Sequence, residues 1–127
     1  KKKKLLKGRL FQTMFKHFSK DEFACSHTGN NEIQDKFIEM LDILRENCGF
    51  PFVITSGYRD PSHPDEVSKE QPGTHSRGIA ADIYVSDGAQ RRSIIENAID
   101  IGFGGIGVAK GFVHVDIRDT TPVMWTY

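Results

Sequence analysis

The sequence predicts one α+β domain in which a small antiparallel sheet is flanked by helices. Three observations lead to this class. Two segments repeat apolar side chains at helical spacing, four short segments have the composition or the alternation of strands, and the two kinds of segment do not alternate regularly along the chain. The length of 127 residues suits one domain built around a single core.

The first structured segments are expected to be a short turn and a long helix. Ser19, with a glutamate three residues later, has the pattern of a capped helical start. Residues 31–48 then place apolar side chains near a 3.6-residue period, which gives this helix one apolar face. Asn30 or Asn31 is expected to cap the helix, and Gly49 is expected to end it.

The rest of the chain is expected to contain strands, one further helix and two irregular connections. Residues 87–101 predict the second helix, capped by Ser86 or Asp87. Residues 57–74 are rich in Gly, Pro, Ser and Asp and predict a long loop, and a loop of this length in a small domain is usually functional. Residues 102–107 are dense in glycine and predict a connection. The expected strands are residues 52–55, 80–85, 112–118 and, at the edge of the sheet, 123–127.

Charge is distributed unevenly along the chain. The formal net charge is zero, yet residues 1–10 hold six basic groups and no acidic ones, which leaves 11 basic and 17 acidic residues in the remainder. We therefore expect residues 1–16 to be a basic tail or extension, either a solvated tail or an electrostatic tether to an anionic polymer or membrane. Residues 17–127 form the expected domain, as a monomer. Its acidic balance argues against nucleic-acid binding, and no apolar run approaches the roughly 18 residues of a transmembrane segment.

The two cysteines leave two possibilities open. Cys25 and Cys48 could form a disulfide, because one precedes the first long helix and the other ends it, or they could remain thiols. Neither belongs to a C-x-x-C motif, which argues against a metal site built on cysteine. We favour two free thiols.

Three residues have the side chains and the setting of a metal site. His75 and Asp82 lie where the long loop enters a strand, and His114 lies on another expected strand. Pairing of these strands would bring Asp82 and His114 to one face, and Gly78 would let the chain turn so that His75 converges on them. Three protein ligands with an open fourth position are the arrangement of a catalytic zinc, so the pattern points to a hydrolase with one zinc per chain.

Two charged residues near these ligands are candidates for catalysis. Asp116 lies two residues after His114, so on a strand both side chains face the same way. Its carboxylate could act as general base, or it could hold the imidazole of His114 in the required tautomer. Arg59 follows the first strand, where a guanidinium suits an anionic substrate group or a developing oxyanion. The alternative for Arg59 is a salt bridge to Asp60 or another loop carboxylate.

These motifs resemble those of the zinc D-alanyl-D-alanine peptidases. Residues 75–82, HSRGIAAD, fit the H-x-x-G-x-A-x-D signature of that family, and residues 112–116, FVHVD, resemble the second signature of the branch that ends in H-V-D. Residues 56–59, SGYR, resemble the segment whose arginine helps to bind the substrate or the transition state. The resemblance covers about residues 17–127. It implies the small zinc fold that these peptidases share with lysostaphin-type endopeptidases and the hedgehog signalling domain.

The resemblance also implies a reaction and a set of roles. A single zinc would be held by His75, Asp82 and His114, and the enzyme would hydrolyse D-amino-acid-containing stem peptides of bacterial peptidoglycan, in the periplasm or outside the cell. Compact relatives of this kind are often phage-encoded, as endolysins or tail-associated enzymes. Catalysis would fall to Asp116 and Arg59. The stem peptide would contact Arg59, Tyr58 and Ser56, although Tyr58 could equally pack in the core.

Two positions depart from the pattern of the relatives, and two other functions stay open. Many relatives carry a serine where this chain has Gly73, and other branches carry an acidic base where this chain has Gly111, which moves the base to Asp116. One alternative function is a zinc-bearing binding module that has lost catalysis. The other is a structural component of a larger particle, such as a phage tail.

Overall fold

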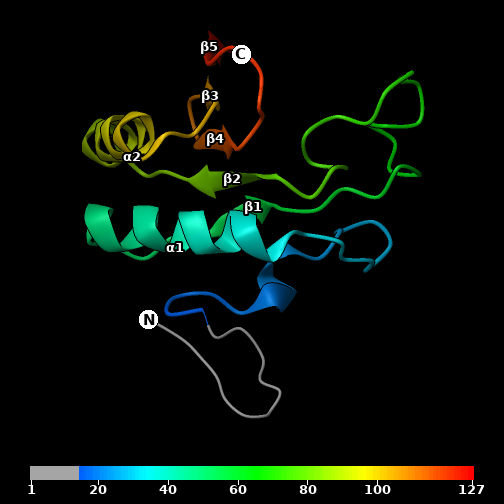
Figure 1. Ribbon diagram of the computed structural model, residues 1–127, viewed down its shortest axis with the longest axis horizontal. Coiled ribbons are helices and arrows are strands. Elements are labelled where there is room, and N and C mark those ends of the chain that lie inside the picture. Colours follow the sequence, from blue (N-terminus) through cyan, green and yellow to red (C-terminus); the bar gives the residue numbers. More distant parts are fainter. Residues whose placement is uncertain (1–14) are drawn as a thin grey trace.

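The computed structural model describes residues 15–127, and the α+β class is confirmed. Within this range five strands form a sheet in the order β1-β2-β4-β3-β5, accompanied by two α-helices and a short 3₁₀ helix (Figure 1). Nearly all of the expected basic tail lies outside the described residues. The elements in chain order are η1 (Lys20–Phe23), α1 (Asp35–Cys48), β1 (Ile54–Ser56), β2 (Ala80–Tyr84), α2 (Gly88–Ile101), β3 (Gly105–Val108), β4 (Phe112–Asp116) and β5 (Val123–Thr126).

Helix α1 starts four residues later than the periodicity predicts. Gln34 occupies the N-cap position, so the prediction of an asparagine cap is wrong. The side chain of Asn31 instead accepts a hydrogen bond from the backbone N–H of Ile33 at 3.2 Å, and the N–H of Gln34 donates to the carbonyl oxygen of Gly78 at 2.9 Å. These bonds hold the residues before α1 extended against the loop that leads into β2.

Three other local predictions are confirmed. Gly49 ends α1 in the left-handed conformation with φ 78°, which glycine adopts without a steric penalty. The carboxylate of Asp87 caps α2 by accepting a hydrogen bond from the N–H of Gln90 at 2.8 Å. Ser19 and Glu22 form a capping box around η1. The side chain of Ser19 accepts a hydrogen bond from the backbone N–H of Glu22, and the carboxylate of Glu22 accepts one from the backbone N–H of Ser19.

The glycine-dense segment after α2 contains a strand, β3, so the prediction of a plain connection is wrong. A Cβ on Gly105 would lie 2.3 Å from Oδ2 of Asp116, and a Cβ on Gly107 would lie 2.7 Å from Nε1 of Trp125. Glycine is therefore required where side chains of the neighbouring strands cover β3, and composition alone cannot distinguish this case from a break. β3 pairs with β5 in parallel, so the sheet is mixed rather than purely antiparallel.

Alternation along the two central strands separates a core face from an open face. Ala81 and Ile83 of β2 and Val113 and Val115 of β4 are buried in the hydrophobic core together with the apolar sides of α1 and α2. The intervening positions of both strands point to the opposite face, and they include two of the expected metal ligands. The helices thus support the sheet from one side and leave the other side for chemistry.

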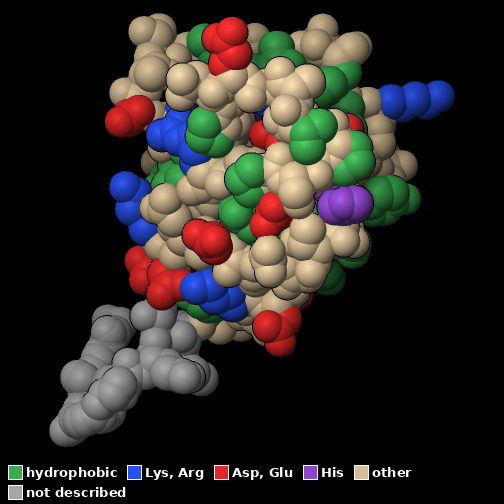
Figure 2. All heavy atoms as spheres, turned by 90° about the vertical axis from the view of Figure 1, so that its right-hand side faces the viewer, with side chains coloured by type: hydrophobic (Ala, Val, Ile, Leu, Met, Phe, Trp, Pro, Cys, Tyr) green, Lys and Arg blue, Asp and Glu red, His purple; other side chains and the backbone are tan. Residues whose placement is uncertain are grey.

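A long loop lies between β1 and β2, as its composition predicts. Residues 57–79 contain turns but no helix or strand, and they form the green segment at the right of Figure 1. Figure 2 shows this end of the molecule, where acidic and basic side chains are interspersed rather than gathered by sign. The face shown therefore offers no extended basic surface of the kind that binds a phosphate backbone.

The sequence also predicts the state of the cysteines and the absence of a membrane-spanning helix. Cys25 and Cys48 are free thiols, the first buried and the second partly buried, in agreement with the favoured alternative. Among residues 15–127, no helix has the length and apolar character needed to cross a membrane.

Candidate metal centre

One row of residues crosses the open face of the sheet from edge to edge. Asp82 on β2 lies opposite His114 on β4, and His114 lies opposite Gly107 on β3. The row continues to Ser56 on β1 and to Trp125 on β5. Directly opposite residues of neighbouring strands project to the same side, so strand pairing alone brings Asp82 and His114 together, as predicted.

The third candidate ligand, His75, reaches this row because the loop makes a tight turn at Gly78. Gly78 has φ 73°, and a Cβ there would lie 2.2 Å from the carbonyl oxygen of Glu32. Glycine is therefore needed both for the backbone conformation and for close approach to the segment before α1. The turn is further fixed by the N–H of Ile79, which donates to the carbonyl oxygen of Thr74 at 3.2 Å.

Three donor atoms converge at the centre of the row. Nε2 of His75 lies 3.2 Å from Oδ1 of Asp82, and Nδ1 of His114 lies 3.0 Å from the same oxygen. All three side chains are buried, and one ligand atom from each lies within 4.8 Å of the others. Among the described residues, this is the single group of three or more His, Cys, Asp or Glu side chains so arranged.

The hydrogen bonds behind the two imidazoles show that the site fits a metal cation. Nδ1 of His75 lies 2.8 Å from the carbonyl oxygen of Gly57, and Nε2 of His114 lies 2.7 Å from Oδ2 of Asp116. A carbonyl or carboxylate oxygen can only accept, so these two nitrogens carry the ring protons. The other two ring nitrogens face Oδ1 of Asp82 and donate to it in the metal-free chain. A cation that replaced those protons would be held by the two freed lone pairs and the carboxylate.

The charges of the centre are strongly coupled. Burial would raise the pKa of Asp82, but hydrogen bonds from His114 and His75 outweigh it and lower the pKa to about 2. Burial would lower the pKa of His114, yet its bonds to Asp116 and Asp82 raise it above the ordinary value. Asp82 is therefore ionised at neutral pH, as a metal-binding carboxylate must be.

Asp116 lies behind His114, on the side away from Asp82. It is fully buried, and besides His114 its carboxylate accepts hydrogen bonds from Nε of Arg118 at 2.9 Å, from Nη2 of Arg118 at 2.7 Å and from the Arg118 N–H at 3.1 Å. Burial alone would raise the pKa of Asp116, but the bonds from Arg118 and His114 hold it well below its usual range. Of the two roles considered for Asp116, this geometry favours orientation of the His114 ring over proton abstraction.

Arg59 is held at both terminal nitrogens of its guanidinium. Nη1 donates to Oε2 of Glu66 at 3.2 Å, and Nη2 donates to the hydroxyl of Ser56 at 3.2 Å. The backbone N–H of Arg59 also donates to the carbonyl oxygen of His75 at 3.2 Å, which ties it to a candidate ligand. The loop carboxylate that pairs with Arg59 is thus Glu66, whereas Asp60 accepts from Asn30 and Ser62.

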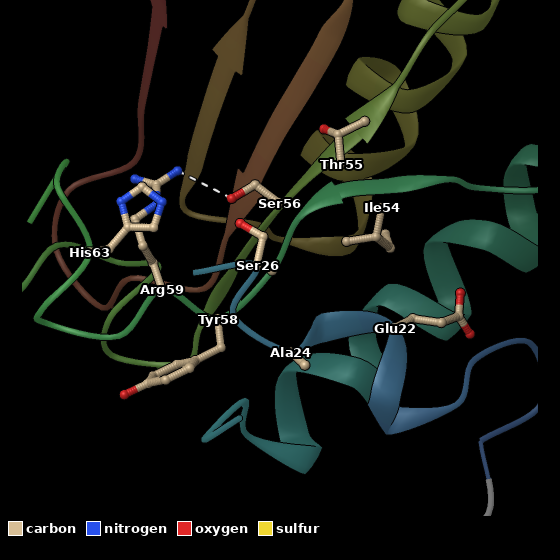
Figure 3. Close-up of a pocket in the computed structure, with 10 residues that line it drawn as sticks. Glu22, Ala24, Ser26, Ile54, Thr55, Ser56, Tyr58, Arg59 and His63 are labelled. Carbon is tan, nitrogen blue, oxygen red and sulfur yellow. Dashed lines mark hydrogen bonds between the residues drawn. The ribbon is translucent and has the colours of Figure 1, made fainter. Parts of the chain in front are cut away.

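A cavity of about 140 Å³ opens beside β1 and is lined in part by the predicted substrate-binding residues. Figure 3 shows Ser56 and Arg59 joined by their hydrogen bond at one end of it, with His63 beside Arg59. The ring of Tyr58 points away from this end, and with 5% of its surface exposed it packs in the core. The candidate metal ligands do not line this cavity, which lies one strand away from Asp82.

The two departures from the relatives have different structural settings. A Cβ on Gly73 would lie 3.1 Å from Nζ of Lys69 and 3.4 Å from Oε1 of Glu66, so the place of the relatives' serine side chain is next to this ion pair. A Cβ on Gly111 would meet nothing within 4 Å. The position therefore has room for a side chain, but this chain does not supply the acidic residue of the other branches.

Sequence reasoning missed three residues of this region. Glu66 lies in a loop without periodicity, so no pattern singles it out. Arg118 lies two residues after Asp116, and extending the same-face rule by one step would have found it. Trp125 lies in the expected edge strand, where no pattern marks it as part of the site. Its ring centroid lies 5.1 Å from that of His114, and the Arg118 guanidinium lies over the Trp125 ring, 5.0 Å from its centroid.

Comparison with known proteins agrees with this geometry. The family model described as Peptidase M15 matches residues 16–116, which include all three candidate ligands. No curated protein matches the chain significantly. Because the family model spans most of the chain and the structure brings a buried His-Asp-His group together inside the matched region, the chain belongs to the zinc peptidase family M15, with His75, Asp82 and His114 as its candidate metal site.

Proposed function

We propose that this protein is a zinc metallopeptidase that hydrolyses D-amino-acid-containing stem peptides or cross-links of bacterial peptidoglycan, as endolysins do. The observation that carries the proposal is the convergence of His75 Nε2, Asp82 Oδ1 and His114 Nδ1, with the protons of both rings held on the opposite nitrogens. Three such ligands leave a fourth position open for substrate or water.

The described residues supply orientation and charge for this reaction. When bound, zinc would act as a Lewis acid and lower the pKa of water to about 7. Asp116 holds the tautomer of His114, and Arg118 keeps Asp116 ionised and in place. Gly57 does the same for His75 through its carbonyl oxygen. These supports keep both rings in the geometry that metal binding needs.

Arg59 is the candidate for substrate recognition. Its guanidinium lies at the end of the cavity beside β1, next to Ser56, and Ser56 lies opposite Asp82. A guanidinium at this position suits the carboxylate of a stem peptide or the oxyanion that develops during hydrolysis. Ser56 fixes the guanidinium, and Tyr58 forms a wall of the cavity from within the core.

The test is digestion of purified peptidoglycan together with metal analysis. We expect about one zinc per chain and the release of fragments that mass spectrometry identifies, with both lost in His75→Ala and His114→Ala. His17→Ala is the matched control, because His17 pairs with Glu46 at the surface. Loss of a terminal D-residue would define a carboxypeptidase, and separation of cross-linked stems an endopeptidase.

Two other outcomes would replace the proposal. Stoichiometric zinc without any release of fragments would indicate a zinc-bearing binding module or a structural particle component. Absence of zinc, with no uptake of added zinc at neutral pH, would contradict the assignment as a zinc hydrolase.

A further inference from the structure

We propose that Glu66 is a positioning residue that orients the Arg59 guanidinium for an anionic group of the substrate. The inference rests on the proposed function, because it assigns Arg59 to substrate recognition. Among the described residues, five polar or charged side chains are buried; four of them make or support the metal centre, and the fifth is Glu66, with 5% of its surface exposed.

The carboxylate of Glu66 is satisfied by four groups of the loop. Oε2 accepts from Nη1 of Arg59 at 3.2 Å and from Nζ of Lys69 at 2.8 Å. Oε1 lies 3.0 Å from the hydroxyl of Ser76 and 3.4 Å from the backbone N of Gly73. A buried carboxylate is costly unless it is paired in this way, so the network holds Glu66 in one place.

The two oxygens of Glu66 hold different parts of the candidate site. One oxygen binds the side chain of Arg59, and the other binds residues on both sides of His75. The hydroxyl of Ser76, with one proton to share between two acceptors, also lies 2.5 Å from the carbonyl oxygen of Arg59. Glu66 therefore sets the position of the guanidinium relative to the segment that carries a metal ligand.

The hydrogen bonds of Arg59 leave donors for a ligand. An arginine has five N–H donors in a rigid plane, and Glu66 and Ser56 take one on each terminal nitrogen. Two bonds at opposite corners fix the direction of the plane. The remaining donors are then presented in a fixed direction, which suits the bidentate binding of a carboxylate.

Lys69 explains how Arg59 keeps its attraction for an anion. A Glu66–Arg59 pair alone would have no net charge. Lys69 adds a second cation to the same carboxylate oxygen, and its side chain is 44% exposed. The three groups together carry a formal charge of +1, so the guanidinium is oriented by Glu66 without being neutralised.

The test compares Glu66→Gln with Arg59→Ala and with the double variant, using kcat and KM for a synthetic stem peptide that ends in D-Ala-D-Ala. We expect Glu66→Gln to retain zinc and to stay folded at the assay temperature, and to lose about 10- to 100-fold in kcat/KM. The loss should fall mainly on KM if Arg59 binds the ground-state carboxylate. In the Arg59→Ala background the same substitution should change little, because the group that it orients is gone. Glu96→Gln, at an exposed ion pair on α2, is the matched control.

A second readout is independent of hydrolysis. NMR signals of the Arg59 guanidinium, assigned by their loss in Arg59→Lys, should show two distinct and slowly exchanging Nη groups in the natural chain and averaged ones in Glu66→Gln. An active natural enzyme with an equally active Glu66→Gln variant, or losses that add in the double variant, would overturn the inference. An inactive natural enzyme would contradict the proposed function alone, since the NMR comparison still decides whether Glu66 holds Arg59.

Discussion

Asp116 and Asp82 occupy opposite sides of one imidazole. Oδ2 of Asp116 lies 2.7 Å from Nε2 of His114, and Oδ1 of Asp82 lies 3.0 Å from its Nδ1. The two carboxylates share His114 as a partner but have different roles. Asp116 is bound by Arg118 and holds a ring proton on Nε2, whereas Asp82 accepts from Nδ1, the nitrogen whose lone pair a bound metal would take.

The first prediction concerns this division of tasks. Asp116→Asn places an amide beside His114 that can donate as well as accept, so the ring can shift its proton to Nδ1. We expect the affinity for zinc to fall about 10- to 100-fold while the fold is retained. Competition with a chromophoric chelator measures the affinity. Asp119→Asn, at an exposed position three residues beyond β4, is the control. Equal affinity in the natural chain and Asp116→Asn would refute the assigned role.

The second prediction concerns stability against pH. Burial would raise the pKa of Glu66, but hydrogen bonds from Lys69, Ser76 and Arg59 lower it from 4.5 to about 2. A carboxyl group whose pKa is lower in the folded chain stabilises the fold at pH above the unfolded value, and this stabilisation is lost as pH falls toward the folded value. Glu66→Gln should therefore lower the free energy of unfolding at pH 7 by roughly 1–3 kcal/mol.

Urea denaturation of metal-free protein at pH 7, 5 and 3 tests this expectation. The difference between the natural chain and Glu66→Gln should stay constant from pH 7 to 5 and shrink between pH 5 and 2. Comparison of variants at each pH removes the contribution of the histidines, which both chains share. A difference that does not depend on pH would contradict the lowered pKa.

The third prediction concerns the glycines of β3. A Cβ on Gly105 would overlap the carboxylate of Asp116, at 2.3 to 2.5 Å from its atoms. Gly105→Ala should therefore displace Asp116, destabilise the fold by about 1–3 kcal/mol and weaken zinc binding. Gly111→Ala is a matched substitution, because a Cβ there meets nothing within 4 Å. Thermal unfolding and zinc titration of the two variants should separate them clearly; similar behaviour would show that β3 tolerates a side chain at position 105.

The fourth prediction uses Trp125 as a reporter of metal binding. The chain has one tryptophan, and its ring centroid lies 5.1 Å from that of His114. Co²⁺ bound at the candidate site should quench the fluorescence of Trp125, with saturation near one ion per chain and reversal by excess zinc. In His75→Ala the saturable quenching should disappear, although Trp125 is unchanged. Quenching that persists in His75→Ala would place the ion elsewhere.

The grouping of the candidate ligands could be predicted from the sequence because it depends on strand geometry. Alternation on β2 and β4, together with antiparallel pairing, was enough to place Asp82 beside His114. The start of α1 could not be predicted in the same way, because a bond between Gln34 and Gly78, distant in the sequence, replaces the first turn of the helix. The helix propensity of a segment does not record such tertiary contacts, so it cannot predict where they limit the helix.

Other parts of the site depend on space and burial, which no short sequence pattern records. β3 is a strand because its glycines leave room for Asp116 and Trp125, and the same glycines look like a break when read alone. Glu66 is one acidic residue among several in a polar loop, and only its burial distinguishes it. The sequence leaves two roles open for Asp116, because no short pattern places Arg118 against its carboxylate.

The separation of the ligands along the chain has a consequence for folding kinetics. Asp82 and His114 are 32 residues apart, and α2 and β3 lie between them, so their pairing is a non-local contact that we expect to form late in folding. Zinc can then bind with full affinity only after β2 and β4 have paired. The ion should accordingly slow unfolding far more than it speeds refolding, and the holoprotein would owe its persistence to a kinetic barrier.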